Sequence, residues 1–335
     1  MLIILAAFLF AAVSCGVGLV VLTRILPPDF LAAQMTARSN HSIAARQIGG
    51  LIVVPVIITT LLVFSDDLGL DTPFLFCLVT AMIGLWIIGW LDDRYELSET
   101  IRLAVQLVAA CLVAYGLGGN FRLLPDLLPA PLEPVLVVVV LMVAINVTNF
   151  MDGLDLMTVV GTGIPLAGIA LVCALGLAGL ASGGMGAAAA GALTGFAFHN
   201  RPPARVFLGD SGSLPLGLVA GTALLVLARE TSIIIALLIP LYYILDAGTT
   251  VLLRLFEGEN ILKAHSKHAY QVAKRAGWSV MKVVLHVAVL NLMLVACVVA
   301  ALLFNHPMSL AAFLLIGTVA TLLLLLDFRG RIRKL

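Results

Sequence analysis

Charged residues are scarce in this sequence. Asp, Glu, Lys and Arg make up 11% of its 335 residues, and 62% of the residues are hydrophobic, whereas soluble domains carry about 25% charged residues. The formal net charge of +1 is too balanced to indicate a nucleic acid as a partner. The composition therefore excludes an ordinary soluble domain and predicts a protein that lies in a bilayer.

Paired cysteines and a basic leader are also missing. The five cysteines show no CxxC or CxxH spacing, so the sequence predicts neither a zinc site nor a disulfide framework. No basic residue precedes the apolar stretch 1–22, which argues against a cleaved secretory signal. We interpret this stretch as the first membrane span and the cysteines as small buried hydrophobic residues.

Long hydrophobic runs recur along the whole chain. A hydrocarbon core of about 30 Å needs roughly 20 apolar residues in a helix, and about eleven segments approach that length. The chain is therefore expected to be an all-α, polytopic integral membrane protein with a single domain over 1–335. The predicted spans are 1–22, 48–64, 74–90, 101–118, 134–150, 156–179, 184–199, 212–228, 231–251, 280–304 and 308–327.

Lys and Arg are distributed unevenly between the connections. With the N-terminus outside, all but two of the 19 Lys and Arg residues fall in inside segments, the exceptions being Arg122 and Arg229. The outside connection 65–71 carries only acidic charges. We therefore predict an N-out/C-in topology with cytoplasmic catalytic loops at 23–47, 91–100, 146–156, 199–211 and 252–279.

Carboxylates gather at the cytoplasmic ends of the predicted spans, although each costs about 3 kcal/mol or more near a bilayer centre. Asp92 and Asp93 follow an apolar run that ends at Leu91, where the helix macrodipole disfavours negative charge. A compensating cation is expected there, and Mg²⁺ with oxygen ligands would serve. The structural alternative is a pair of solvated aspartates in a short turn.

Amides and carboxylates alternate after the fifth predicted span. Asn146 and Asn149 are three residues apart and share one side of a helix. Gly153 then allows a turn that brings Asp152 and Asp155 near them. Such groups could bind a nucleobase, a ribose or sugar hydroxyls, although an asparagine pair also serves to join helices.

A glycine-rich segment follows the seventh predicted span. Two prolines at 202–203 end that helix, and the segment 209–213 opens the next one. Backbone N–H groups at such a helix start suit phosphate, and Asp210 could join Asp92 or Asp93 around a metal. The alternative is an ordinary Asp or Ser N-cap.

The loop 252–279 is the longest and most basic of the cytoplasmic loops. His265 and His268 lie three residues apart on either side of Lys267, an arrangement that could clamp a diphosphate. A cytoplasmic loop needs no function to be basic, so interface anchoring is the alternative.

Together, these four segments resemble the polyprenyl-phosphate N-acetylhexosamine-1-phosphate transferase family, also called glycosyltransferase family 4. The family's DD pair matches 92–93, its NxxNxxDGxD pattern matches 146–155, and its NxxPAxVFxGDxGS pattern matches 200–213. The resemblance covers about 38–279. The HxxHAYQ pattern at 265–271 is similar to that of the WecA- and WbpL-like branch, which begins O-antigen units.

Two departures from the family pattern stand out. The family's Pro-Arg-Gly-Gly-Gly is here Arg46-Gln-Ile-Gly-Gly50, which leaves the role of that arginine in doubt or moves it to Arg46. The usual Gly-Leu-Ala after the Asp-Gly-x-Asp segment is here Leu156-Met157-Thr158. Neither change removes a carboxylate.

The resemblance implies an enzyme that transfers a sugar-1-phosphate from a UDP-N-acetyl sugar to undecaprenyl phosphate and releases UMP. It implies a multi-pass protein of the bacterial inner membrane, with its active site facing the cytoplasm and an assembly that could be a homodimer. The implied cofactor is Mg²⁺, for which Mn²⁺ would substitute. The expected product is a lipid-linked precursor of lipopolysaccharide O-antigen or another surface glycan. The implied roles are catalysis for Asp92, Asp93 and Asp210, Mg²⁺ binding for Asp210 and Asp93, and substrate binding for Asn149, Asp152, Asp155, Asn200, Arg254, His265, Lys267 and His268.

Two other interpretations stay open. The first is an enzyme of peptidoglycan synthesis in the same family, of the phospho-MurNAc-pentapeptide translocase type, in which a histidine triplet is expected at 265–271. The second is a membrane transporter, because intramembrane carboxylates also mark ion pathways. A transporter should carry charges near span midpoints and show repeated halves, and neither is evident in the sequence.

Overall fold

The computed structural model describes residues 1–32, 45–260 and 265–330. Within these ranges the chain forms helices and turns, with isolated β-bridges and no strand, which confirms the predicted all-α class. The helices in chain order are α1 (Leu2–Ile25), α2 (Gly50–Val63), α3 (Thr72–Tyr95), α4 (Glu99–Leu117), η1 (Ala130–Leu132), α5 (Glu133–Met151), η2 (Val159–Gly163), α6 (Ile164–Ala174), α7 (Leu180–Asn200), α8 (Asp210–Glu230), α9 (Ile233–Leu238), α10 (Leu241–Phe256), α11 (Ala269–Arg275), α12 (Val280–Phe304) and α13 (Pro307–Phe328).

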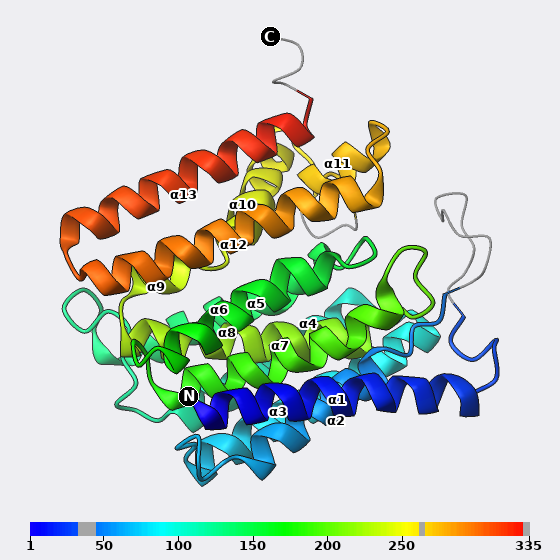
Figure 1. The fold of residues 1–335 in the computed structure, drawn as a ribbon, viewed down its shortest axis with the longest axis horizontal. Helices are drawn as coiled ribbons and strands as arrows, with labels where there is room; N and C mark the ends of the chain where they lie inside the picture. Colours follow the sequence, from blue (N-terminus) through cyan, green and yellow to red (C-terminus); the bar gives the residue numbers. More distant parts are fainter. Residues whose placement is uncertain (33–44, 261–264, 331–335) are drawn as a thin grey trace.

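The long helices form a bundle in which most axes run in a common direction (Figure 1). Seven of them are long and apolar enough to cross a membrane, namely α1, α3, α4, α5 together with η1, α8, α12 and α13. Shorter apolar helices are α2 and the segment formed by η2 and α6. Each predicted span overlaps a helical segment, so the chain is a polytopic membrane protein.

Two predicted spans differ in detail from the helices. The segment 231–251 is not one helix, because α9 ends before Pro240 and α10 begins after it, where proline has no N–H to continue the hydrogen-bond ladder. The segment 156–179 is helical only over 159–174. Gly176 follows in a left-handed conformation, with φ of +75°, and turns the chain toward α7.

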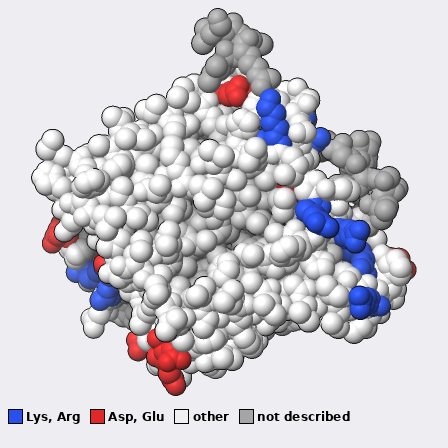
Figure 2. Space-filling view, viewed as in Figure 1, with Lys and Arg blue, Asp and Glu red and all other residues white. Residues whose placement is uncertain are grey.

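Charged side chains lie at the two ends of the helix bundle. Figure 2 shows most of the visible Lys and Arg at the right-hand end, where α1 ends, and a broad uncharged band between them and the charges at the left. A hydrocarbon core requires such a band. The side of the membrane on which each end lies stays a prediction.

Helix α7 forms the centre of the bundle and consists mainly of Gly and Ala. A Cβ added to Gly191 would lie 2.3 Å from the backbone oxygen of Phe8, and one added to Gly195 would lie 2.4 Å from that of Ala12. Small residues therefore let α1 and α7 pack backbone to backbone, as the composition of the segment 156–199 predicts.

The start of α8 is enclosed in the same way by α2 and α3. A Cβ on Gly50 would meet the backbone nitrogen of Gly212 at 2.3 Å, and a Cβ on Gly89 would meet the backbone carbonyl of Asp210 at 2.4 Å. These two glycines allow the helices to converge on the residues that the sequence predicts to be catalytic.

Candidate active site

The last turn of α3 carries Asp92 and Asp93, so part of the predicted loop 91–100 is helical. The chain turns at Glu96, which has a φ of 50°, and α4 starts at Glu99. Because both aspartates sit on a helix, their carboxylates point in fixed and different directions.

Asp93 binds the beginning of α8. Its Oδ1 accepts a hydrogen bond from the N–H of Asp210 at 2.8 Å, and its Oδ2 accepts one from the N–H of Ser211 at 3.1 Å. A Cβ on Gly209 would lie 2.6 Å from the same carboxylate. The amides at this helix start, which the sequence assigned to phosphate, are therefore occupied by a carboxylate, a favourable partner for a helix N-terminus.

Asp92 faces a different partner, Arg102 on α4. The Nη1 of Arg102 lies 2.9 Å from Oδ2 of Asp92 and 3.3 Å from Oδ2 of Asp210. The other Asp92 oxygen accepts a hydrogen bond from the N–H of Leu97 at 2.7 Å. Two carboxylates from distant parts of the sequence thus share one guanidinium.

Asn146 and Asn149 on α5 form hydrogen bonds with different partners. Asn149 donates to Oδ1 of Asp210 at 2.8 Å and to the hydroxyl of Ser213 at 2.9 Å. Asn146 donates to the side-chain oxygen of Gln106 at 2.7 Å, which joins α5 to α4. Only Asn149 therefore belongs to the carboxylate cluster, and Asn146 fits the helix-joining alternative.

Asp152 lies directly after α5 and accepts a short hydrogen bond from the hydroxyl of Thr158. Burial raises the pKa of this carboxyl to about 6, the Thr158 hydrogen bond lowers it, and the charges of Asp93 and Asp155 raise it further. Asp152 is thus within electrostatic reach of the carboxylates on α3.

Asp155 and Asn200 tie the loop after α5 to the loop after α7. Asp155 accepts a hydrogen bond from the N–H of Ala204 at 3.0 Å. Asn200 accepts one from the N–H of Leu156 at 2.6 Å and donates to the carbonyl of Val206 at 2.8 Å. Leu156, which stands where the family pattern has glycine, has a φ of 62°. Both predicted substrate-binding residues thus already hold backbone groups in place.

The histidine segment packs against the end of α5. The rings of His265 and His268 lie 4.9 Å apart, and each is 6.3 Å from the ring of Phe150. The Tyr270 hydroxyl donates to the carbonyl of Phe150 at 3.0 Å, and a Cβ on Gly153 would lie 2.2 Å from that hydroxyl oxygen. The fourth predicted segment therefore meets the second one directly.

The two histidines differ in environment. Burial, followed by the charges of His268 and Arg254, lowers the pKa of His265 to about 4, so its ring is neutral near pH 7. His268 is 2% exposed, with its Nδ1 3.7 Å from Asp246 Oδ1. The same oxygen of Asp246 accepts a hydrogen bond from the N–H of Ala269 at 2.8 Å, which anchors α11.

Two cations that were predicted to bind substrate are paired with glutamates. Arg254 is 3% exposed and its Nε lies 3.1 Å from Glu259. Lys267 contacts Glu257 at 2.7 Å and also pairs closely with Glu259. The structure does not bring these cations to the carboxylate cluster. Lys263, a further cation of the loop 252–279, lies outside the described residues.

Arg46, the position to which the family's arginine was moved, lies at the end of α1. Its guanidinium donates to the carbonyls of Thr23 at 3.1 Å, Leu26 at 3.2 Å and Pro27 at 3.3 Å. Its backbone forms a bridge with Val206. Arg46 thus organises the connection between α1 and the loop after α7.

The cluster suits a hard cation, although no three His, Cys, Asp or Glu side chains in the described ranges are grouped as a ready metal site. Mg²⁺ commonly takes only one or two carboxylates and completes its shell with water and substrate phosphates. Asp92 and Asp210 already aim oxygens at one cationic atom of Arg102, whereas both oxygens of Asp93 bind α8. The donor geometry therefore fits Mg²⁺ between Asp92 and Asp210 better than at Asp93.

Sequence reasoning missed the role of Arg102, which was counted only as an inside positive charge. The available signal was an arginine in the first turn of an apolar helix, soon after two carboxylates at a helix C-terminus. Thr158 was likewise noted only as a departure from the family pattern. Its hydroxyl carries the hydrogen bond to Asp152.

Comparison with known proteins identifies relatives of this chain. Residues 75–228 match the family model described as Glycosyl transferase family 4. Two phospho-N-acetylmuramoyl-pentapeptide-transferases are similar. The one from Symbiobacterium thermophilum is 29% identical over 76% of this chain and 81% of its own length, and the one from Synechococcus sp. strain RCC307 is 30% identical over 74% of each chain.

A second kind of relative is also found. The undecaprenyl-phosphate alpha-N-acetylglucosaminyl 1-phosphate transferase of Thermotoga maritima is 34% identical over 56% of this chain and 54% of its own length. Most of the relatives compared carry the pentapeptide-transferase name. The comparisons therefore bear out the family that the motifs indicate, but favour the pentapeptide-transferase branch over the O-antigen branch that the histidine segment suggested.

Proposed function

This chain belongs to glycosyl transferase family 4, and we propose that it transfers a sugar-1-phosphate from a UDP-sugar to undecaprenyl phosphate. The observation that carries the proposal is the convergence of Asp92 and Asp210 on one cationic atom, with Asn149 holding Asp210 in place. Converging carboxylates can hold a cation, and a cation suits a reaction in which the negative charge of two phosphates must be neutralised.

The proposed reaction is a displacement at phosphorus. An oxygen of undecaprenyl phosphate attacks the β-phosphorus of the UDP-sugar, the bond from that phosphorus to the bridging oxygen breaks, and UMP leaves with the electron pair. Bound Mg²⁺, or Mn²⁺ in its place, would supply Lewis-acid stabilisation of the phosphate charges. Catalysis of this kind is mostly positioning and charge neutralisation.

The residues of the chain would divide this task. Asp92 and Asp210 would hold the cation, and Arg102 would then turn its guanidinium toward a substrate phosphate. Asp93 would fix the position of Asp210 through the backbone of α8. The lipid phosphate has already lost its first proton at neutral pH, so the mechanism needs little help from a general base.

The remaining predicted residues would bind the substrate or hold the loops that bind it. His265, with a neutral ring, and His268 would contact the diphosphate or sugar beside Phe150, and Asp152 would hold the nucleotide. Asp155 and Asn200 would act by fixing the loops that carry the binding groups. Arg254 and Lys267 would reach substrate only if they left their glutamate partners.

The first candidate donor is UDP-N-acetylmuramoyl-pentapeptide, because pentapeptide transferases predominate among the relatives. The second is a UDP-N-acetylhexosamine or 6-deoxyhexosamine for O-antigen synthesis. The HxxHAYQ segment and the similarity to the N-acetylglucosaminyl 1-phosphate transferase support it. In both cases we propose that the basic end of the bundle faces the cytoplasm, where nucleotide sugars are available, and homodimerisation stays a prediction.

One assay separates these donors. Purified protein in detergent is incubated with undecaprenyl phosphate, Mg²⁺ and each UDP-sugar in turn, and UMP release and lipid-linked product are measured. We expect product from one donor class, loss of product with a chelator, and loss in Asp210→Asn protein that elutes as folded protein. Absence of Mg²⁺-dependent product from every donor, or a near-normal rate in Asp210→Asn, contradicts the proposal.

A further inference from the structure

Two adjoining pockets lie at the end of α1 and α7, beside the carboxylate cluster rather than within it. The larger, with a volume of about 420 Å³, is lined by Phe198, His199, Arg201, Pro202, Pro203 and Arg205. The other, of about 400 Å³, is lined by Val20, Thr23, Arg24, Arg46, His199 and Arg205. His199 and Arg205 line both pockets, so the two adjoin at these side chains, and together they are called here the arginine hollow.

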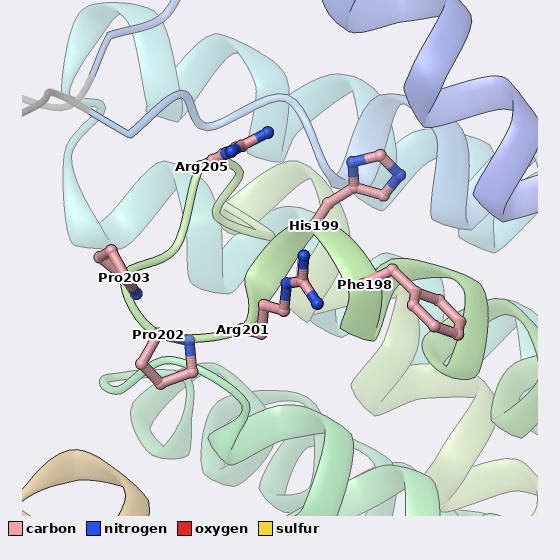
Figure 3. Close-up of a pocket in the computed structure, with 6 residues that line it drawn as sticks. All are labelled: Phe198, His199, Arg201, Pro202, Pro203 and Arg205. Carbon is pink, nitrogen blue, oxygen red and sulfur yellow. The ribbon is translucent and has the colours of Figure 1, made fainter.

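The side chains of the larger pocket come from the end of α7 and the loop that follows it. Figure 3 shows Arg201 turned back toward His199 and Arg205 on the part of the loop that returns toward the bundle. Phe198 lies on the far side of the helix end. The chain thus wraps around the larger pocket and presents nitrogen atoms from separate positions.

Positive charge in the arginine hollow has no acidic counterpart in the described part of the chain. Arg24, Arg201 and Arg205 are exposed, and no carboxylate among the described residues pairs with them. Arg46 adds a fourth guanidinium, which carbonyls at the end of α1 hold in place. Four arginines from three segments of the chain therefore line the hollow, and no described carboxylate pairs with them.

The arginine hollow borders the apolar surface of the bundle. Phe198 is 69% exposed and Val20 is 38% exposed, and both line the hollow. Scattered arginines at this end need no explanation beyond the topology. Arginines that surround a hollow with an apolar margin need a further explanation. One guanidinium group can bind two oxygens of a phosphate, and acyl chains can lie along the apolar margin.

We propose that the arginine hollow binds the phosphate of an anionic phospholipid headgroup, with the lipid chains lying along Phe198 and Val20. A free phosphate ion offers the same chemistry to the arginines but makes no use of the apolar margin. None of the residues predicted to bind the substrate lines the arginine hollow.

The test measures lipid binding to delipidated protein in detergent. Native mass spectrometry counts bound phosphatidylglycerol and phosphatidylcholine, and inorganic phosphate is added as a competitor. We expect phosphatidylglycerol to bind in preference, and the double variant Arg24→Gln with Arg205→Gln to bind it about 10-fold or more weakly, because each lost contact is a charged hydrogen bond. The matched control, Lys274→Gln with Lys282→Gln, removes two charges from the same end and should bind as the unaltered protein does.

The other outcomes overturn the proposal. If the two lipids bind equally, the hollow does not select an anionic headgroup. If the double variant and the control bind phosphatidylglycerol equally, the arginines do not bind the lipid. Displacement of the lipid by millimolar inorganic phosphate, with the same arginine dependence, assigns the hollow to a free anion. Arg205→Gln alone, which alters both pockets, gives the same comparison if the double variant does not fold.

Discussion

Asp92 and Asp93 are adjacent in the sequence, yet their carboxylates have different partners. Asp93 is bonded to the backbone of α8, and Asp92 to Arg102. We therefore expect Asp93→Asn to lower the free energy of unfolding by about 1 kcal/mol, since a carboxylate at a helix N-terminus is lost. Asp92→Asn should cost less stability, because it also relieves repulsion from Asp210, but should lower the transfer rate about 100-fold or more.

Thermal unfolding in detergent and initial rates of UMP release check this pair of variants. The division of roles is contradicted if Asp92→Asn destabilises the protein as much as Asp93→Asn does. It is also contradicted if Asp92→Asn retains normal activity.

Leu156 carries backbone strain in the loop between α5 and η2. Its φ of 62° lies in the left-handed region, which costs a residue with a Cβ about 1–3 kcal/mol. Leu156→Gly removes this strain but adds freedom to the unfolded chain and loses some burial, so we expect a net stabilisation of up to about 1 kcal/mol. Leu154→Gly, in the same loop without positive φ, is the control and should destabilise. The melting temperatures of the two variants must move in opposite directions.

At the residue scale, the sequence predicts which aspartates meet but not how they are used. The motifs place Asp92, Asp93, Asp210 and Asn149 in one site, and the structure does bring them together. Which oxygen of each faces Arg102 depends on the rotation of α3 about its axis, and that rotation follows from packing around glycines. Pattern and spacing contain no information on it.

Helix α3 offers a matched pair of glycines for testing close packing. A Cβ at Gly89 would lie 2.4 Å from the backbone of Asp210, whereas a Cβ at Gly84 has nothing within 4 Å. Gly89→Ala must push α3 and α8 apart, and overpacking of this kind costs about 1–3 kcal/mol. Gly84→Ala should be neutral or stabilise by up to about 1 kcal/mol through helix propensity.

Activity and melting temperature distinguish the two alanine variants. We expect Gly89→Ala to lose most transfer activity, because the start of α8 carries Asp210. If Gly89→Ala behaves as Gly84→Ala does, the approach of α3 to α8 is not what positions Asp210.

At the scale of helices, hydropathy gives the order of the helical segments but misses their interruptions, and seven of the described helices, not eleven, are long and apolar enough to cross a membrane. The break at Pro240 falls inside a continuous apolar run, and the helix α11 falls inside a basic loop. Both depend on local backbone hydrogen bonding, such as that from Ala269 to Asp246. The average hydrophobicity of a window does not register such bonds.

The whole molecule has charged ends and an uncharged middle, and the orientation of those ends can be tested. Single cysteines are introduced as Asp67→Cys and Lys274→Cys in a background without the native cysteines. An N-out/C-in topology predicts that Asp67→Cys reacts with a membrane-impermeant maleimide in intact spheroplasts. Lys274→Cys should react only after the membrane is opened, and the reverse pattern contradicts the orientation.

On this largest scale the sequence is most informative, because a bilayer imposes simple rules on length and charge. The all-α class, the order of the spans and the gathering of the four motif segments near one end of the bundle all follow from these rules. The arginine hollow does not, since its walls come from Arg24, Arg46 and the loop 201–205, which no spacing rule connects.

The small side chains of α7 limit the mutations that this helix can accept. A base change that replaces alanine yields a larger residue in every case except glycine, and one that replaces glycine always adds a side chain or ends the chain. Gly191 and Gly195 meet the backbone of α1 in the middle of α7. Almost every amino-acid replacement that one base change can produce there is therefore expected to disturb the packing. A saturation library of this gene should show its densest block of lost variants there, in a helix that carries no Asp, Glu, Lys or Arg.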